Sequence, residues 1–515
     1  MNRAIASERM QGTDWTRRQV LGAMGLGVGA AALPFGARSA FGAESPDVSI
    51  QLVAAPARVS IWRGPETDVL RFTAKVIGGR ADAVREATGY LGPTLELRRG
   101  ERVRIEFVNR TEDSSIVHWH GMIVPDTADG HPRFAVAPGR SYVYDFTVRN
   151  PAGTYLYHPH PHGRTGRQVY FGLAGLLIVR DDDEKVVGLP PLERELALVI
   201  QDRRAGSGNE LVFKRMMMDT MNGVLGDTVL VNGVADAVFD VASDTYRLRL
   251  ANVSNARIYK LAWTDGRPLR VISAGSGLFS RAEGVRSHPY VVLAPFQRVE
   301  LLEDFGARQG SGAVALISKG FDDPGGMGGM MRGMMGGGMM GGAQGEELPI
   351  ARFTVAAGSR TTSAPLRLPE PSPLARKGKT ERHTRLAFNM MQGSLSGRVF
   401  SMDAVAADEH LPLGEETVWT FSNATGGMAM PHPMHIHGVR FRVIARSAGA
   451  PADLREGLID AGCQDTVLVF PGERVHLAVT PTEPGMFMYH CHNLEHEDGG
   501  MMRNCWFGPA PITAV

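Results

Sequence analysis

The chain has 515 residues, with 55 basic and 54 acidic side chains and a formal net charge of +1. This balance excludes the strongly basic surface by which proteins bind nucleic acids. Hydrophobic residues make up 43% of the chain and charged residues 21%, which is ordinary for a soluble globular protein.

The N-terminal segment predicts export. Arg17 and Arg18 precede an apolar run, rich in Gly and Ala, that reaches about Phe35, and small residues follow to Ala43. We interpret residues 1–43 as a twin-arginine signal peptide and expect a periplasmic protein. A short membrane anchor is the alternative, but the run is too brief and too glycine-rich to span a bilayer well. No later segment is typical of a membrane span, so we expect no stable membrane association.

Three similar strand patterns predict three domains. After the leader about 470 residues remain, which suits about three domains. Alternating segments at 100–109, 244–252 and 414–423 each end in Asn. A turn that begins with Pro and another alternating strand follow each of them; the turns are Pro138-Gly139-Arg140, Pro295-Phe296-Gln297-Arg298 and Pro471-Gly472-Glu473-Arg474. Short strands separated by turns predict an all-β protein built from Greek-key β-sandwiches.

The domain boundaries follow from these repeats and from composition. We expect the first domain at 44–184, the second at 185–357 and the third at 383–515. Between the second and third lies a stretch rich in Pro, Ser, Arg and Lys, which predicts a linker at 358–382.

Four His-x-His pairs are the strongest chemical signal in the chain. In an extended segment both rings of such a pair lie on the same face. The pairs supply eight imidazoles, which predicts one shared metal cluster: His118 and His120, His158 and His160, His435 and His437, His490 and His492. All of them lie in the first and third repeats, so the cluster is expected between those two domains.

A second metal site is predicted from the residues around the last pair. Cys491 lies between His490 and His492 and points to the opposite face of an extended strand. A thiolate with two imidazoles and a distant thioether is the ligand set of a blue copper site. The remaining candidates for it are His432, Cys491, His496 and Met501.

These motifs, in this order, resemble those of the multicopper oxidases. The runs 158–176 and 496–502 are especially similar to the bacterial copper-efflux (cuprous) oxidases. The resemblance implies three cupredoxin-like domains and four copper ions as cofactors. It implies type 1 ligands His432, Cys491, His496 and Met501; type 2 ligands His118 and His435; and type 3 ligands His120, His158, His160, His437, His490 and His492.

The resemblance also implies a reaction. Electrons from a reducing substrate enter at the type 1 copper and reduce O2 to water at the other three ions. Glu497 and Asp129 match acidic positions that deliver protons in the similar oxidases, and the alternative is that they orient imidazoles.

A segment rich in Met and Gly at 325–342 indicates the reducing substrate. Thioethers are soft ligands that select Cu(I), and the efflux oxidases have a methionine-rich segment at a similar place. We expect a lid that gathers Cu(I) through Met327, Met330, Met331, Met334, Met335, Met339 and Met340; a low-complexity insertion without function is the alternative. Met216, Met217, Met218 and Met221 either belong to the core, which we favour, or add to this set of thioethers. Asp465 matches an acidic position that binds substrate copper near the type 1 site.

The leading hypothesis is therefore a monomeric periplasmic oxidase that takes electrons from Cu(I), passes them to O2 and detoxifies copper. A laccase-like oxidase of phenols or siderophores is the alternative enzyme, and a copper-binding protein without turnover is a third reading. The two cysteines outside the motifs, Cys463 and Cys505, could pair in an oxidising compartment, although two separate thiols are favoured.

Overall fold

The computed structural model describes residues 45–87, 89–213, 217–308, 313–325, 342–357, 365–371, 376–389, 392–425 and 429–509. The predicted signal peptide, the seven methionines of the Met- and Gly-rich segment, Met216 and much of the predicted linker lie outside these residues. Within them no helix is both long enough and apolar enough to cross a membrane.

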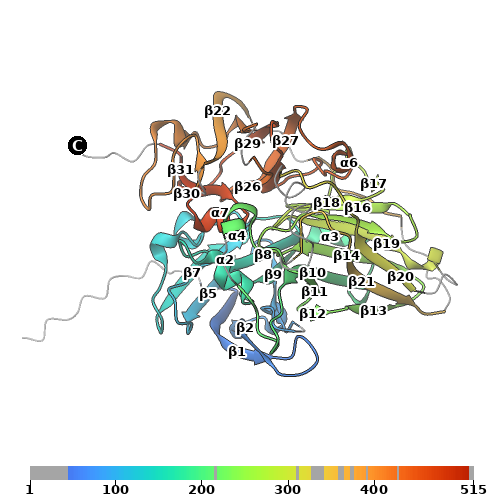
Figure 1. Cartoon of the computed structure of the whole chain (residues 1–515). Helices are drawn as coiled ribbons and strands as arrows, with labels where there is room; N and C mark the ends of the chain where they lie inside the picture. Colours follow the sequence, from blue (N-terminus) through green and yellow to red (C-terminus); the bar gives the residue numbers. More distant parts are fainter. Residues whose placement is uncertain are drawn as a thin grey trace, which may run out of the picture. The chain divides into compact units, whose positions relative to one another are not determined.

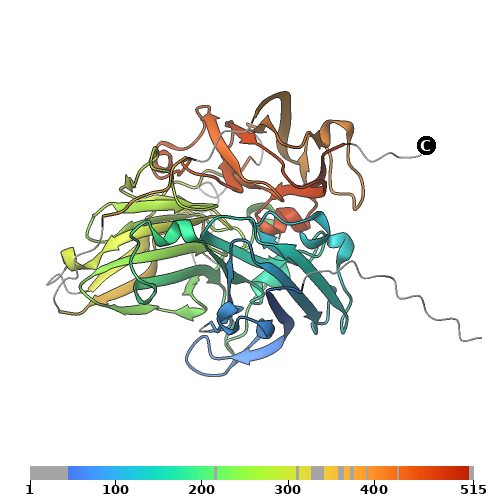
Figure 2. The same cartoon turned by 180° about the vertical axis from the view of Figure 1, so that it is seen from behind.

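The strands form three pairs of sheets that follow one another along the chain (Figures 1 and 2). The first pair has one sheet in the order β2 (Thr67–Gly79), β1 (Val48–Val59), β5 (Arg102–Asn109) and β7 (Ser141–Thr147). Its other sheet has the order β3 (Val84–Arg85), β4 (Thr94–Arg98), β9 (Gly175–Arg180), β8 (Gly153–Pro159) and β6 (Val117–His120).

The second pair is the largest. One sheet has the order β12 (Val234–Ala235), β11 (Thr228–Val231), β10 (Glu195–Arg203), β14 (Thr245–Asn252), β19 (Arg298–Asp304), β16 (Leu269–Ala274) and β17 (Arg286–His288). The other has the order β13 (Val238–Val241), β21 (Leu348–Val355), β20 (Ala313–Ser318), β15 (Tyr259–Trp263) and β18 (Val291–Leu293).

The third pair contains the remaining strands. One sheet has the order β23 (Gln392–Leu395), β22 (Arg376–Asn389), β25 (Glu415–Asn423), β29 (Arg474–Val479) and β27 (Phe441–Arg446). The other has the order β24 (His410–Leu411), β31 (Met502–Phe507), β30 (Gly485–Cys491), β26 (His432–Ile436) and β28 (Thr466–Val469).

Helices are short and lie between strands. The α-helices are α2 (Thr165–Tyr170), α3 (Asp182–Lys185), α4 (Met217–Asn222), α6 (Ala452–Arg455) and α7 (Leu494–Asp498). Single 3-10 turns are η2 (Ala81–Ala83), η3 (Asp126–Ala128), η4 (Pro132–Phe134), η5 (Leu192–Arg194), η6 (Phe305–Arg308) and η7 (Ala407–Glu409). The all-β prediction is therefore confirmed.

The three repeated strands are confirmed as β5, β14 and β25. Each pairs antiparallel with the strand that follows its Pro-led turn, which is β7, β19 or β29. Each sheet pair encloses its own apolar core with a fully buried tryptophan, namely Trp119, Trp263 or Trp419. The repeat in the sequence is thus a repeat of one packing unit, although the predicted domain limits stay predictions.

The predicted linker overlaps a strand. Residues 376–382 were expected in the linker, but they form the first half of β22, which pairs in parallel with β25 from Arg376 and Glu415 onward. Polar side chains are tolerated there because Arg376, Lys377 and Glu381 are exposed. Farther along, β22 alternates, with Arg382, Thr384 and Leu386 buried and the residues between them exposed. The chain therefore joins the third sheet pair before residue 383.

All three cysteines are unpaired, so the prediction that Cys463 and Cys505 are two separate thiols is confirmed. Cys463 is half-buried, whereas Cys491 and Cys505 are fully buried.

Candidate metal centre

Cys491 lies between two imidazoles from different elements, and we call these three residues the cysteine group. His432 begins β26, Cys491 ends β30 and His496 lies in α7. Nδ1 of His432 is 3.4 Å from Sγ of Cys491, and Nδ1 of His496 is 3.5 Å from it. Nε2 of His496 donates to the carbonyl oxygen of Met221 at 2.8 Å, so its Nδ1 offers a lone pair towards the sulfur.

The fourth predicted ligand of this group is fixed by its backbone. The amide of Met501 donates to the carbonyl of His496 at 2.9 Å, and its carbonyl accepts from the amide of Cys491 at 3.0 Å. Its side chain is fully buried. Only a glycine fits opposite it, because a Cβ on Gly393 would lie 2.9 Å from the thioether sulfur. Met501 therefore packs in the core that holds Cys491.

The protonation states of this group suit a metal ion. Burial lowers the pKa of His432, and it lowers the pKa of His496 to about 4, so both rings are neutral near pH 7. Burial raises the pKa of the Cys491 thiol well above its usual value. A thiolate at this position therefore needs a cation beside it. Thiolate, thioether and two imidazoles together favour copper.

The eight paired histidines converge into one cluster, which we divide into three groups by the contacts between their rings. In the first, Nε2 of His118 and Nε2 of His435 are 3.3 Å apart. In the His490 group, Nε2 of His490 is 3.3 Å from Nε2 of His160 and 3.0 Å from Nε2 of His437.

The remaining three imidazoles form the His492 group. Nε2 of His492 is 3.2 Å from Nδ1 of His120. The ring of His158 lies near both, with centroids 5.1 Å from His492 and 5.7 Å from His120. Each of the three groups draws on both the first and the third sheet pair, which is the arrangement expected from the sequence.

Hydrogen bonds to the outer ring nitrogens turn the inner nitrogens towards the cluster. Nδ1 of His118 donates to the carbonyl of Asp129 at 2.6 Å, and Nδ1 of His435 donates to the carbonyl of Asp465 at 2.7 Å. Nδ1 of His490 likewise donates to the carbonyl of Cys491 at 3.1 Å. These bonds fix the tautomer that leaves Nε2 free to bind a metal.

Burial lowers the pKa of all eight imidazoles, which keeps them neutral. Neutral imidazoles packed with their nitrogens facing one another leave buried acceptors without donors. Nε2 of His158 is buried without a hydrogen-bond partner. Such a group is costly unless a cation occupies the space between the nitrogens, so the residues fit bound copper ions.

The two predicted proton carriers lie at this cluster. Oδ2 of Asp129 is 2.7 Å from Nδ1 of His437. Oε1 of Glu497 is 3.5 Å from Nε2 of His160, and its Oε2 is 3.3 Å from Nδ1 of His490. Burial raises the pKa of both carboxyl groups. Both acids therefore touch imidazoles that the sequence assigns to copper.

Asp465 does not lie where it was predicted. It was expected beside the cysteine group as a ligand of substrate copper, but it is fully buried in the histidine cluster. Its Oδ1 is 3.0 Å from Nε2 of His120, and both oxygens accept from Arg298, at 2.7 and 2.6 Å. Asp465 is therefore closed to solvent and faces the histidine cluster, so its predicted place beside the cysteine group is wrong.

Three residues next to the metal groups were not predicted from the sequence, namely Phe388, Met430 and Arg298. Met430 and Met221 pack with Phe388, whose ring lies 4.8 Å from that of His496. Met221 is buried, as expected, but its place against the cysteine group was not foreseen. The position of Met430, two residues before His432, was the available signal for it, whereas nothing local distinguishes Arg298.

Comparison with known proteins agrees with this geometry. Two family models described as multicopper oxidase match residues 72–184 and 371–510. A multicopper oxidase of Staphylococcus haemolyticus is 29% identical over 414 residues, which cover 80% of this chain and 81% of that protein. The crystal structure of the McoA multicopper oxidase from Aquifex aeolicus has a TM-score of 0.74 and 30% identity, and the match covers 90% of this chain and 97% of the other.

A laccase-like multicopper oxidase from Ochrobactrum sp., with oxidase activity towards lignin model compounds, has a TM-score of 0.71 and 29% identity over 90% of this chain and 97% of its own. The fold is accordingly cupredoxin-like, and O2 is the electron acceptor. The chain belongs to the multicopper oxidase family, whose members characteristically bind four copper ions of types 1, 2 and 3.

Proposed function

We propose that this oxidase takes its electrons from Cu(I). The observation that carries the proposal is the position of Gly325, the first residue of the Met- and Gly-rich segment, next to Met430. A Cβ on Gly325 would lie 3.5 Å from that of Met430, and Gly325 and Met430 line a cavity of about 30 Å³ together with Asp323. Met430 in turn packs with Met221 next to His496. Thioethers and a carboxylate at the entrance to the cysteine group are suitable ligands for Cu(I).

We assign one copper ion to each of the three histidine groups and one to the cysteine group. His432, Cys491, His496 and Met501 would hold type 1 copper, and His118 and His435 would hold type 2. The His490 and His492 groups would each hold one type 3 ion. When bound, these ions accept electrons one at a time at Cys491 and reduce O2 with four electrons at the cluster.

The chain itself links the two sites. Cys491 is bonded to His490 and His492 through one peptide unit each, and Nδ1 of His490 donates to the carbonyl of Cys491. An electron that reaches the thiolate therefore has a short covalent path to both type 3 groups.

We also propose that Glu497 and Asp129 hold and deliver protons. Glu497 touches one imidazole of the His490 group at each oxygen, and Asp129 touches a third. Both side chains are buried, so they can hold a proton at the cluster near neutral pH. The rival role is to orient the imidazoles without exchanging protons.

The laccase-like reading remains the second candidate, and the activity of the Ochrobactrum relative towards lignin model compounds favours it. Steady-state O2 consumption by the copper-loaded protein separates the two readings, with Cu(I) and a simple phenol compared in the full chain and in a variant lacking 325–342. We expect efficient Cu(I) oxidation that falls on deletion. Faster phenol oxidation with Cu(I) kinetics unchanged by deletion would instead establish the laccase-like activity.

We propose that the enzyme works in the periplasm as a monomer and detoxifies copper there by making Cu(II). Replacement of Arg17 and Arg18 by Lys should retain the protein in the cytoplasm, as seen by cell fractionation. Periplasmic accumulation of the doubly substituted chain would contradict export by the twin-arginine route.

A further inference from the structure

The turn between β18 and β19 has a side chain where its two counterparts have none. Gly139 and Gly472 follow the proline of the equivalent turns in the first and third repeats, with φ of +75° and +76°. The middle repeat has Phe296 at this position, with φ of +60°. A bulky residue in the left-handed region is a strained outlier, which points to a role for its side chain.

The ring of Phe296 packs on the histidine cluster. It stacks on His492 with centroids 4.0 Å apart and planes at 23°. It meets His158 edge to face at 4.6 Å and lies 5.7 Å from His120. These three imidazoles are the His492 group. The side chain is fully buried, so it also excludes water from that side of the group.

Arg298 acts on the same group from the same turn. Its Nη1 and Nη2 donate to the two oxygens of Asp465, and Oδ1 of Asp465 contacts Nε2 of His120. A two-nitrogen contact of this kind fixes both the charge and the orientation of a carboxylate. The ionised carboxylate accepts the Nε2 proton of His120, which leaves Nδ1 as the nitrogen facing His492.

The arginine is itself held by the first and second repeats. Its Nε donates to the carbonyl of Thr154 at 3.2 Å, and Nη2 donates to the carbonyl of Gly275 at 3.2 Å. The neighbouring Gln297 donates to the carbonyl of Thr466 at 3.0 Å. One turn of the middle repeat therefore touches β8 of the first repeat, which carries His158, and β28 of the third repeat, which pairs with β26.

We infer that the turn 295–298 positions the His492 group, with Phe296 fixing the His158 and His492 rings and Arg298 fixing His120. The middle repeat, which supplies no ligand, thereby determines whether one of the two type 3 positions can hold copper. The inference rests on the proposed assignment of His120, His158 and His492 to one copper ion. Phe296 and Arg298 are positioning residues, because they act through the imidazoles.

Two variants of Phe296 in the full, copper-loaded chain test this role. Phe296→Leu keeps an apolar side chain but removes the stacked ring, and Phe296→Gly removes the ring while relieving the strained backbone. Both should weaken copper binding at one type 3 position about 10- to 100-fold. Loss of that ion uncouples the type 3 pair, so EPR should detect a new Cu(II) signal, while the blue absorption of the cysteine group stays unchanged.

Phe305→Leu is the matched control. Phe305 is also fully buried in the middle repeat, but it packs against Trp263 and Phe353 in the core. This variant should lower the melting temperature and keep the full copper content and the silent type 3 pair. If Phe305→Leu gave the same EPR change as the two Phe296 variants, general weakening of the middle repeat would explain all three. That result would overturn the inference.

Arg298→Lys provides a second, independent arm. Lysine keeps the charge but cannot contact both oxygens of Asp465, so the same type 3 signal should appear. Wild-type copper content and EPR spectra in the Phe296 and Arg298 variants would also overturn the inference. His158→Ala separates this from a wrong ligand assignment: if it too retains full copper, the assignment of the His492 group fails rather than the role of the turn.

Discussion

Strand β30 carries the two kinds of metal ligand on its two faces. In register, Cys491 lies opposite Met434 and His490 lies opposite His435. Cys491 and Met434 belong to the core of the third sheet pair, whereas His490 and His435 face the histidine cluster. The alternation of a strand thus separates a one-electron site from a multi-electron site by a single residue.

Cys491→Ser tests the thiolate face alone. Serine is similar in size but is a hard, poorly acidic ligand, so type 1 copper should be lost and the blue absorption with it. Turnover of O2 should fall to background because electrons no longer enter. The visible spectrum, copper content and far-UV circular dichroism check this, with the histidine-bound copper and the fold expected to remain. A blue, active serine variant would refute the type 1 assignment.

Glu497 and Asp498 are adjacent acids with different surroundings. Glu497 contacts His160 and His490, whereas the oxygens of Asp498 accept from the backbone amides of Thr165 and Gly166 at 2.9 and 3.0 Å. Glu497 thus lies against two imidazoles of the cluster, whereas Asp498 holds the backbone at the start of α2.

Glu497→Gln should slow O2 reduction by about 10²-fold, because an amide cannot exchange the proton that a carboxyl group carries. Copper content and the blue absorption should stay unchanged. Asp498→Asn is the control and should affect stability more than turnover. Steady-state rates across pH and metal analysis decide the matter; loss of copper in Glu497→Gln would show instead that the carboxylate mainly orients its histidines.

At the scale of elements, the asparagine that ends each of the three repeated strands makes the same pair of hydrogen bonds in every repeat. Its side-chain amide donates to two carbonyls, one in the chain that follows and one near the neighbouring strand. Asn109 donates to Asp113 and Val136, Asn252 to Arg257 and Leu293, and Asn423 to Met430 and Val469. The repeated Asn was visible in the sequence, but its partners were not, because they lie in loops of different length.

Asn423→Ala should therefore affect the cysteine group, since Met430 and Val469 flank His432 along the chain and across the sheet. Two buried carbonyls lose their donor, which costs about 1–3 kcal/mol each. We expect a lower melting temperature and a shifted blue absorption. Asn252→Ala, in the middle repeat, is the matched control and should destabilise similarly without a spectral change. Equal spectra in both variants would contradict the link to His432.

Element boundaries were predicted best where one face is buried. The strands β5, β14 and β25 alternate cleanly, and their ends agree with the sequence to within two residues. Strand β22 was partly assigned to a linker because its residues 376–382 contain charges at most positions. The charged composition of 376–382 reflects side chains that the strand exposes to solvent. It does not reveal the pairing that holds β22 in the sheet, because the partner strand β25 begins about 40 residues farther along the chain.

At the scale of the molecule, the sequence could predict that the first and third repeats share the cluster, because both carry ligands. It could not predict what the middle repeat contributes. Arg298 and Asp465 are separated by 167 positions and lie in different sheet pairs, so only the fold brings them together. The same is true of the charged network that joins the first two sheet pairs.

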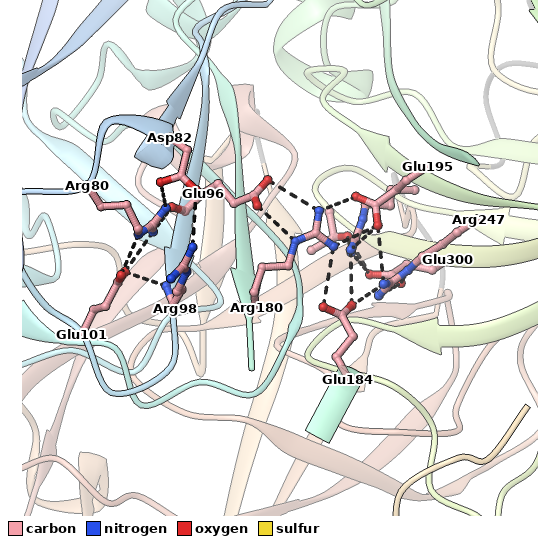
Figure 3. Close-up of polar contacts among 12 residues, drawn as sticks. Arg80, Asp82, Glu96, Arg98, Glu101, Arg180, Glu184, Glu195, Arg247 and Glu300 are labelled. Carbon is pink, nitrogen blue, oxygen red and sulfur yellow. Dashed lines mark hydrogen bonds and ion pairs between the residues drawn. The ribbon is translucent and has the colours of Figure 1, made fainter. Parts of the chain in front are cut away.

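That network lies where β9, β10 and β14 meet, with Arg247, Arg249 and Glu300 fully buried and Arg180 and Glu96 partly exposed (Figure 3). Arg180 contacts Glu96 on one side and Glu195 on the other, and Arg247 contacts both Glu184 and Glu300. Glu195 also accepts from Arg249 at 2.9 Å. Burial raises the pKa of Glu195, but the charge of Arg249 and the hydrogen bonds from Arg180 outweigh it and hold the pKa far below its usual range.

Glu195→Gln should therefore destabilise the protein in a pH-dependent way. Because the folded pKa is depressed, the carboxylate stabilises the fold fully above the unfolded pKa of about 4.3 and loses this effect as pH falls through the folded value. Removing its charge leaves Arg180 and Arg249 under-compensated, at a cost of about 3–5 kcal/mol near pH 7. The difference from wild type should shrink as pH falls below about 4.

Urea unfolding at pH 7 and at several acidic pH values measures this difference directly. Glu66→Gln is the control, because Glu66 is exposed and lies 3.9 Å from Arg58, a pair expected to contribute about 0–1 kcal/mol. A destabilisation by Glu195→Gln that is constant with pH would mean that packing, rather than charge, holds the first two sheet pairs together at this point. A decline with acid would show that ionised Glu195 joins them.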